Sequence, residues 1–185
     1  MPEPEWEVSF LDIAVRFTVE ERMIDLSRRA ALLGVPVLMT LHNAEEALFI
    51  PRTLPEIATR LPASLAGALP SAQQMHVALA VATVVPWLVW LLGRESRVGT
   101  RLLLLLQCVV LVNVAWHVAA AVMLGGYAPG LATALALNLP FSIYLLRRAV
   151  SEQWVTRRAL AGLLALALFI HGPAVALMML IAAPQ

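Results

Sequence analysis

The chain has 185 residues, of which 61% are hydrophobic and 14% are charged, and its mean hydropathy is +0.81. A typical soluble domain is about 45–50% apolar and about 25% charged, so this composition excludes a disordered chain and indicates an integral membrane protein. The formal net charge of +1 argues against a nucleic-acid partner. The single cysteine, Cys108, excludes a disulfide framework within the chain.

The first segment, residues 1–29, is expected to lie outside the membrane. Residues 1–9 are acidic and polar, so they lack the basic and then apolar pattern of a signal peptide. Residues 9–29 place apolar side chains along one helical stripe, which predicts an amphipathic interfacial helix on the cytoplasmic surface. The stripe consists of Phe10, Ile13, Phe17 and Ile24.

Five apolar runs follow within residues 30–185, and each is long enough for a helix across about 30 Å of hydrocarbon, which takes about 20 residues. The predicted fold is therefore an all-α, polytopic bundle of five transmembrane helices in one domain. The predicted spans are residues 30–50, 71–92, 101–124, 130–146 and 158–182. Prolines inside the spans, which are expected to kink them, are Pro36, Pro86, Pro140 and Pro173.

Residues 51–70, between the first two spans, are expected to form a short helix and a loop on the outer face. Thr53 is followed three residues later by Glu56, which is the pattern of a capping box at a helix start. Ser71 and Gln74 form a similar pattern where the second span begins.

The arginines predict the orientation, because cytoplasmic loops carry an excess of basic residues. They gather before the first span, between the second and third spans, and between the fourth and fifth spans. This alternation predicts a multi-pass protein of the cell (inner) membrane with a cytoplasmic N-terminus and an external C-terminus. The residues concerned are Arg28, Arg29, Arg94, Arg97, Arg101, Arg147, Arg148, Arg157 and Arg158.

Ionisable side chains inside spans are candidates for a functional site, because each costs about 2.5–3.5 kcal/mol at a helix centre. The first span contains His42, Glu45 and Glu46, which are three and four residues apart and therefore share one helical face. Asn113 and His117 share a face of the third span for the same reason.

His76 and His171 lie in the second and fifth spans. With a rise of about 1.5 Å per residue, His42, His117 and His171 come out about 10–16 Å below the outer ends of their spans. All the costly groups are therefore expected in one layer of the outer half of the bilayer. Each histidine also has a structural interpretation: a satisfied core residue, an interfacial residue for His76, or a partner for a carbonyl freed by Pro173 in the case of His171.

Imidazoles and carboxylates are the usual ligands of zinc and of non-haem iron, so the layer predicts a divalent metal site. A bound dication would offset the cost of two carboxylates in a low dielectric, and Asn113 would hydrogen-bond a ligand. The candidate ligands are His42, Glu45, Glu46, His117, His76 and His171.

Three motifs occur in order along the chain. Residues 42–46 spell H-x-x-E-E, residues 113–117 spell N-x-x-x-H, and residues 127–133 spell Y-x-P-G-x-x-T. Together, in a small multi-span chain, they resemble the HXXEE-domain family of small bacterial integral membrane proteins. The resemblance supports the polar site and implies an enzymatic activity, but it assigns no reaction. In the third motif Pro129 and Gly130 are typical of a rigid turn, Tyr127 would point to the polar layer, and Thr133 would cap the fourth helix or hydrogen-bond the site.

The leading functional hypothesis is a metal-dependent membrane enzyme that acts on a lipid or another hydrophobic small molecule. Zinc would favour a hydrolase and iron an oxygenase, with His42, Glu45, Glu46 and Tyr127 as catalytic candidates. A carboxylate left free of the metal would be the general base. One alternative is a metal-free acid–base isomerase or cyclase of isoprenoid-like lipids, with Trp116 stabilising a cationic intermediate. Others are a transporter or proton relay, and a structural subunit.

Overall fold

The computed structural model describes residues 27–174, and the regular secondary structure of this part is all helical, as predicted, with turns and loops between the helices. Residues 9–26 of the expected interfacial helix and the end of the fifth expected span lie outside the described residues, while residues 28–29 already belong to the first described helix. The α-helices are α2 (Arg28–Arg60), α3 (Ala63–Ala66), α4 (Ala72–Gly93), α5 (Arg97–Leu124), α6 (Leu131–Thr133), α7 (Leu139–Ser151) and α8 (Arg157–Phe169). Two π-helices, η1 (Ala134–Asn138) and η2 (Ile170–Ala174), interrupt the later part of the chain.

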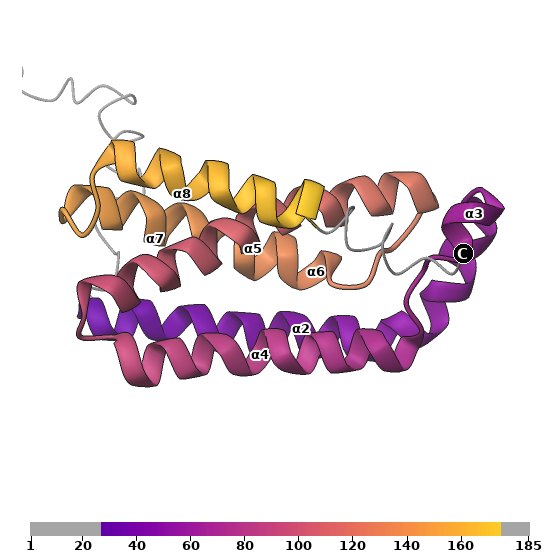
Figure 1. Cartoon of the computed structure of the whole chain (residues 1–185), viewed down its shortest axis with the longest axis horizontal. Coiled ribbons are helices and arrows are strands. Elements are labelled where there is room, and N and C mark those ends of the chain that lie inside the picture. The colour runs from indigo at the N-terminus through magenta and orange to yellow at the C-terminus, as the bar shows by residue number, and fades with distance from the viewer. Residues whose placement is uncertain (1–26, 175–185) are drawn as a thin grey trace, which may run out of the picture.

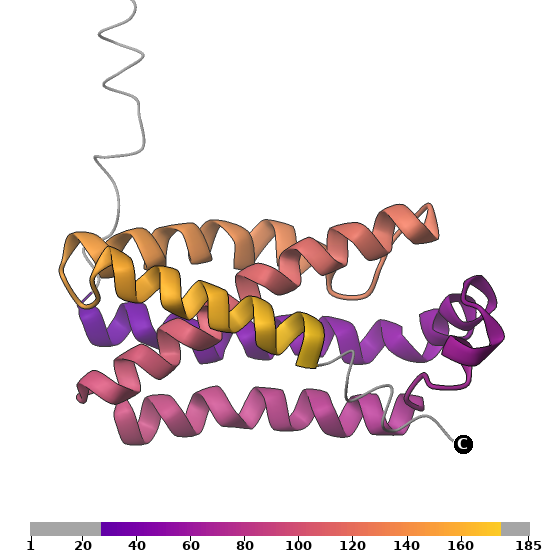
Figure 2. The same ribbon diagram turned by 45° about the horizontal axis from the view of Figure 1, so that its top comes forward.

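The long helices alternate in direction along one axis. In Figures 1 and 2, α2 and α4 lie side by side and antiparallel, while α5 runs obliquely across the bundle towards α7 and α8. The core between these helices is aliphatic. It includes the fully buried side chains of Leu32, Val35, Leu103, Leu104 and Leu145.

Two of the described helices, α4 and α5, are long and apolar enough to cross a membrane. Five spans are not confirmed, although each of the five expected regions is helical where it is described. The fourth expected span is a run of α6, η1 and α7, and the fifth starts as α8 and continues into η2. The predicted capping box at the start of α4 is confirmed, because Ser71 Oγ accepts from the Gln74 amide while Gln74 Oε1 accepts from the Ser71 amide.

Residues 51–60 continue α2, so the separate helix start predicted at Thr53 is wrong. The Thr53 hydroxyl instead donates to the Phe49 carbonyl inside the helix. Pro51 has no N–H, so the carbonyl of Ala47 loses its helical donor. His76 of α4 supplies a replacement, because its Nε2 lies 2.9 Å from the Ala47 carbonyl oxygen. A donor from the neighbouring helix therefore satisfies the carbonyl that Pro51 leaves free, while α2 continues through the proline.

Replacing His76 with leucine should remove this donor and destabilise the protein by about 0.5–1.5 kcal/mol, the usual net value of one hydrogen bond. Thermal unfolding in detergent measures the change. An unchanged unfolding temperature would show that α2 passes Pro51 without help from α4.

The arginine-rich connections meet at one end of the bundle. The start of α2, the α4–α5 connection and the α7–α8 connection lie together at the left of Figure 1. There Arg28 and Arg148 each stack over the ring of Trp154, at 5.6 and 5.7 Å from its centroid. The connection between α5 and α6 lies towards the opposite end.

Candidate functional site

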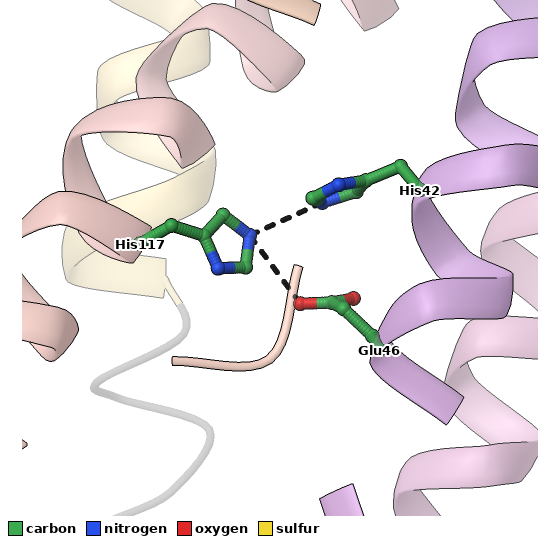
Figure 3. A group of neighbouring side chains, drawn as sticks. All are labelled: His42, Glu46 and His117. Atoms are coloured by element: carbon green, nitrogen blue, oxygen red, sulfur yellow. Dashed lines mark hydrogen bonds and ion pairs between the residues drawn. The ribbon is translucent and has the colours of Figure 1, made fainter. Parts of the chain in front are cut away.

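Two helices contribute the central group of polar side chains. His42 and Glu46 lie one turn apart on α2 and face His117 of α5 (Figure 3). The Nε2 atoms of His42 and His117 are 3.1 Å apart, and His117 Nε2 is 3.4 Å from Glu46 Oε1. One ligand atom from each of the three residues lies within 4.8 Å of the others, so the group could hold a metal ion.

The group is removed from solvent. His42 is 2% exposed, His117 is 7% exposed and the Glu46 side chain is 16% exposed. The two imidazole rings meet edge to face, with their centroids 4.8 Å apart. A carboxylate held away from water is costly unless a positive charge compensates it, and a bound cation would do so.

Asn113 lies one turn before His117 on α5, and its side-chain amide is within hydrogen-bond distance of both imidazoles. Its Nδ2 lies 3.1 Å from His42 Nε2 and 2.8 Å from His117 Nε2. Its Oδ1 lies 2.8 Å from Nε2 of His171, which is in η2. His171 therefore reaches the group through Asn113.

Thr133 orients the ring of His42. The Thr133 hydroxyl lies 2.8 Å from His42 Nδ1 and donates to the carbonyl of Gly130 at 3.3 Å. In the tautomer that carries its proton on Nδ1, His42 donates to the Thr133 hydroxyl. In that tautomer Nε2 keeps its lone pair, and this atom, 3.1 Å from His117 Nε2, is available to a metal.

Glu45 does not face His117 as Glu46 does; it bonds to residues 127–133 instead. It accepts hydrogen bonds from the Tyr127 hydroxyl, from the Ala132 amide at 3.1 Å and from the Thr133 amide at 2.8 Å. These amides belong to the first turn of α6, whose N-cap, Gly130, offers no side chain. A carboxylate satisfies such unpaired amides and complements the helix dipole. Partial burial and the bond to Glu45 raise the pKa of Tyr127 to about 12, so the phenol remains protonated and donates.

Residues 127–133, here called the covering segment, lie directly against the central group. Gly130 has φ = 82°, a conformation that side chains rarely adopt. A Cβ atom there would lie 2.7 Å from His117 Cε1, 2.8 Å from His42 Cε1 and 2.9 Å from Glu46 Cγ. The position therefore needs glycine both for its backbone angle and for its contact with all three side chains.

Replacing Gly130 with alanine should displace the imidazoles and lower both stability and metal affinity. We expect a loss of about 1–3 kcal/mol from overpacking, together with the cost of the left-handed backbone. Matched thermal unfolding and metal titration of Gly130→Ala and Gly126→Ala test this, because a Cβ at Gly126 meets nothing within 4 Å. Equal behaviour of the two variants would contradict the close contact.

A family model described as "protein of unknown function with HXXEE motif" matches residues 33–145. The chain belongs to the HXXEE family. No curated protein and no solved structure was found to match it.

The geometry gives each part of the HXXEE motif a place. The histidine and the second glutamate are His42 and Glu46, which face His117, whereas the first glutamate, Glu45, holds the covering segment. The matched region includes Asn113 and the covering segment but ends before η2. His171 therefore lies beyond the matched region.

His76 and His171 occupy different surroundings although both come from expected spans. His171 bonds to Asn113 of the central network. His76 bonds to the Ala47 carbonyl, and it is not part of the group that could hold a metal. The structural interpretation of His171 is a hydrogen bond to a carbonyl freed by Pro173. In the structure it is His76 that bonds to a carbonyl freed by a proline, that of Ala47 before Pro51.

Sequence reasoning missed a second buried polar cluster between α5 and α7. Gln107 Nε2 donates to Ser142 Oγ at 2.7 Å, and Ser142 donates to the Asn138 carbonyl at 2.6 Å. It also missed Asn43, which joins α2 to Leu79 and Thr83 of α4. The signal was present, because amides within apolar runs need buried partners.

Proposed function

We propose that this chain is a metal-dependent integral membrane enzyme that acts on a lipid or another hydrophobic small molecule. The proposal depends on one observation: two buried imidazoles, His42 and His117, and the partly buried carboxylate of Glu46 come together from two helices. The proposed metal ligands are His42 Nε2, His117 Nε2 and the Glu46 carboxylate.

Two imidazoles and one carboxylate suit two metals with different chemistry. Zinc hydrolases use this ligand set and keep a further position for water. Non-haem iron oxygenases use the same set with positions open to oxygen. We favour hydrolysis of an acyl ester. The water oxygen would bond to the acyl carbon, the acyl–oxygen bond would break, and a water proton would end on the departing alcohol.

The surface supports a membrane location for this enzyme. The face of α4 turned away from the bundle is aliphatic, with Val77, Val81, Val84 and Leu88 about half exposed. The arginine-rich connections share one end of the bundle, which we propose is the cytoplasmic end in a multi-pass arrangement in the cell membrane.

Apolar side chains around the covering segment support a hydrophobic substrate. Phe49 lies one turn beyond Glu45 on α2, and its ring meets that of Tyr127 edge to face at 5.2 Å. Phe49 is 37% exposed and Met123 is 53% exposed. A substrate with an alkyl chain would find an apolar surface next to the covering segment.

Metal analysis of protein purified without a metal-chelating resin tests the proposal. We expect about one zinc or iron per chain, and hydrolysis of lipid esters or oxygen uptake that a chelator abolishes and the metal restores. His76→Leu is the matched control, since it removes a histidine outside the proposed ligand set. Metal content near zero, with no activity after loading with either metal, would contradict the proposal.

A metal-free acid–base enzyme is the second candidate, and one observation favours it. The Glu46–His117 contact pairs a carboxylate with an imidazole without needing a metal. This candidate predicts isomerase or cyclase activity that survives chelation but is lost in Glu46→Gln. Activity lost on chelation would exclude it.

A further inference from the structure

The proposed ligand set leaves out Asn113, although its side-chain amide lies among the ligand atoms. In a tetrahedral centre with bonds of about 2.0–2.2 Å, neighbouring ligand atoms are about 3.3–3.6 Å apart. Two of the three pairs are near that spacing, at 3.1 Å between the imidazole nitrogens and 3.4 Å between His117 and Glu46, and all three ligand atoms lie within 4.8 Å of one another. The Asn113 amide lies 2.8 and 3.1 Å from the same two nitrogens, so it is close enough to the proposed ligands to supply a fourth vertex.

An amide nitrogen does not bind a metal, but an amide oxygen does. A rotation of the Asn113 amide by about 180° around the Cβ–Cγ bond exchanges Oδ1 and Nδ2 without moving the rest of the side chain. The oxygen would then face the metal, and the nitrogen would face His171, whose Nε2 now lies 2.8 Å from Oδ1. Imidazole can accept a hydrogen bond as well as donate one, so His171 can bond to either orientation of the amide.

His171 is well placed to hold the amide in this orientation. It lies in the π-helix η2, which follows α8 and brings the imidazole beside α5. Single π-helical turns frequently occur at functional sites, because they turn side chains out of the regular helical register.

We infer that Asn113 supplies a fourth metal ligand through Oδ1 in the resting protein, and that His171 is the positioning residue that holds it there. The inference rests on the metal centre proposed above. It makes the centre closed at rest. A water or substrate oxygen would enter either by displacing Asn113 or as a fifth ligand.

Cobalt-loaded protein with azide as a probe tests the inference, because visible absorption of Co²⁺ reports the number and type of its ligands. We expect weak azide binding to the unchanged chain. In Asn113→Ala the vertex is open, so azide should bind at least about 10-fold more tightly, while Co²⁺ affinity falls about 10–100-fold. Asn113→Asp keeps a ligand oxygen at the vertex, so azide should remain excluded.

His171 gives the second arm of the experiment. His171→Ala should shift the Co²⁺ spectrum part of the way towards that of Asn113→Ala, and His171→Gln should restore the original spectrum because its amide can accept from Asn113. His76→Leu should leave spectrum and azide affinity unchanged. If Asn113→Ala does not fold, Asn113→Asp and the two His171 variants carry the comparison.

The outcomes separate this inference from the proposed function. Co²⁺ bound by the unchanged chain, with the same spectrum and azide affinity in Asn113→Ala, would overturn the fourth ligand and leave the metal centre standing. No Co²⁺, zinc or iron bound by the unchanged chain would overturn the proposed function, and the inference with it.

Discussion

Replacing His117 with alanine is expected to lower metal affinity by at least about 100-fold, above the usual effect of losing an outer partner of a ligand. His117 is the centre of the group, because its Nε2 lies 3.1 Å from His42 and 3.4 Å from Glu46. Its removal takes away a ligand and leaves Glu46 without its nearest imidazole. Isothermal titration of the apoprotein with zinc measures the loss.

The control for this prediction is His76→Leu, which removes an imidazole at the same expected depth but from the Ala47 contact. Its zinc affinity should equal that of the unchanged chain. Equal zinc affinity in His117→Ala would show that the metal, if any, is held elsewhere.

Glu45→Gln is expected to lower the stability of the protein, whereas Glu46→Gln is expected to lower its metal affinity, although the two residues are adjacent. Glu45 accepts three hydrogen bonds from the covering segment, so its glutamine variant should lose about 1.5–3 kcal/mol of stability with or without metal. Glu46 faces the two histidines, so its glutamine variant should bind metal at least about 100-fold more weakly. Without metal that variant should be as stable as the parent or more so, because a poorly compensated carboxylate has been removed.

Thermal unfolding with and without zinc separates the two effects. The metal-dependent rise in unfolding temperature should persist in Glu45→Gln and disappear in Glu46→Gln. If the rise disappeared in Glu45→Gln and persisted in Glu46→Gln, Glu45 would be the metal ligand, which would contradict the proposed ligand set.

Helical periodicity could predict the shared faces but not the division of labour between the acids. Glu45 and Glu46 are three and four residues from His42, so both qualify for its face. Only the covering segment, whose path depends on the left-handed turn at Gly130, decides which acid meets amides and which meets imidazoles. Turn geometry of this kind has no periodic signal in the sequence.

Sequence position does not predict how a helix is rotated about its axis, and this rotation decides which neighbours a side chain meets. His76 and His171 were expected at the same level as the central group, yet one bonds to a backbone carbonyl and the other to Asn113. Likewise, Pro51 signals a helix end only while the Ala47 carbonyl has no other partner. The partner of this carbonyl comes from α4, a tertiary contact that the local sequence does not reveal. The all-α class, by contrast, follows from composition and apolar runs alone.

A zinc-loaded structure with anomalous scattering recorded at the zinc edge tests the central claim most directly. The account predicts one peak bonded at about 2.0–2.2 Å to the Nε2 atoms of His42 and His117 and to the Glu46 carboxylate. No peak at this point, or a peak held by other residues while these three side chains turn to separate surroundings, would contradict it.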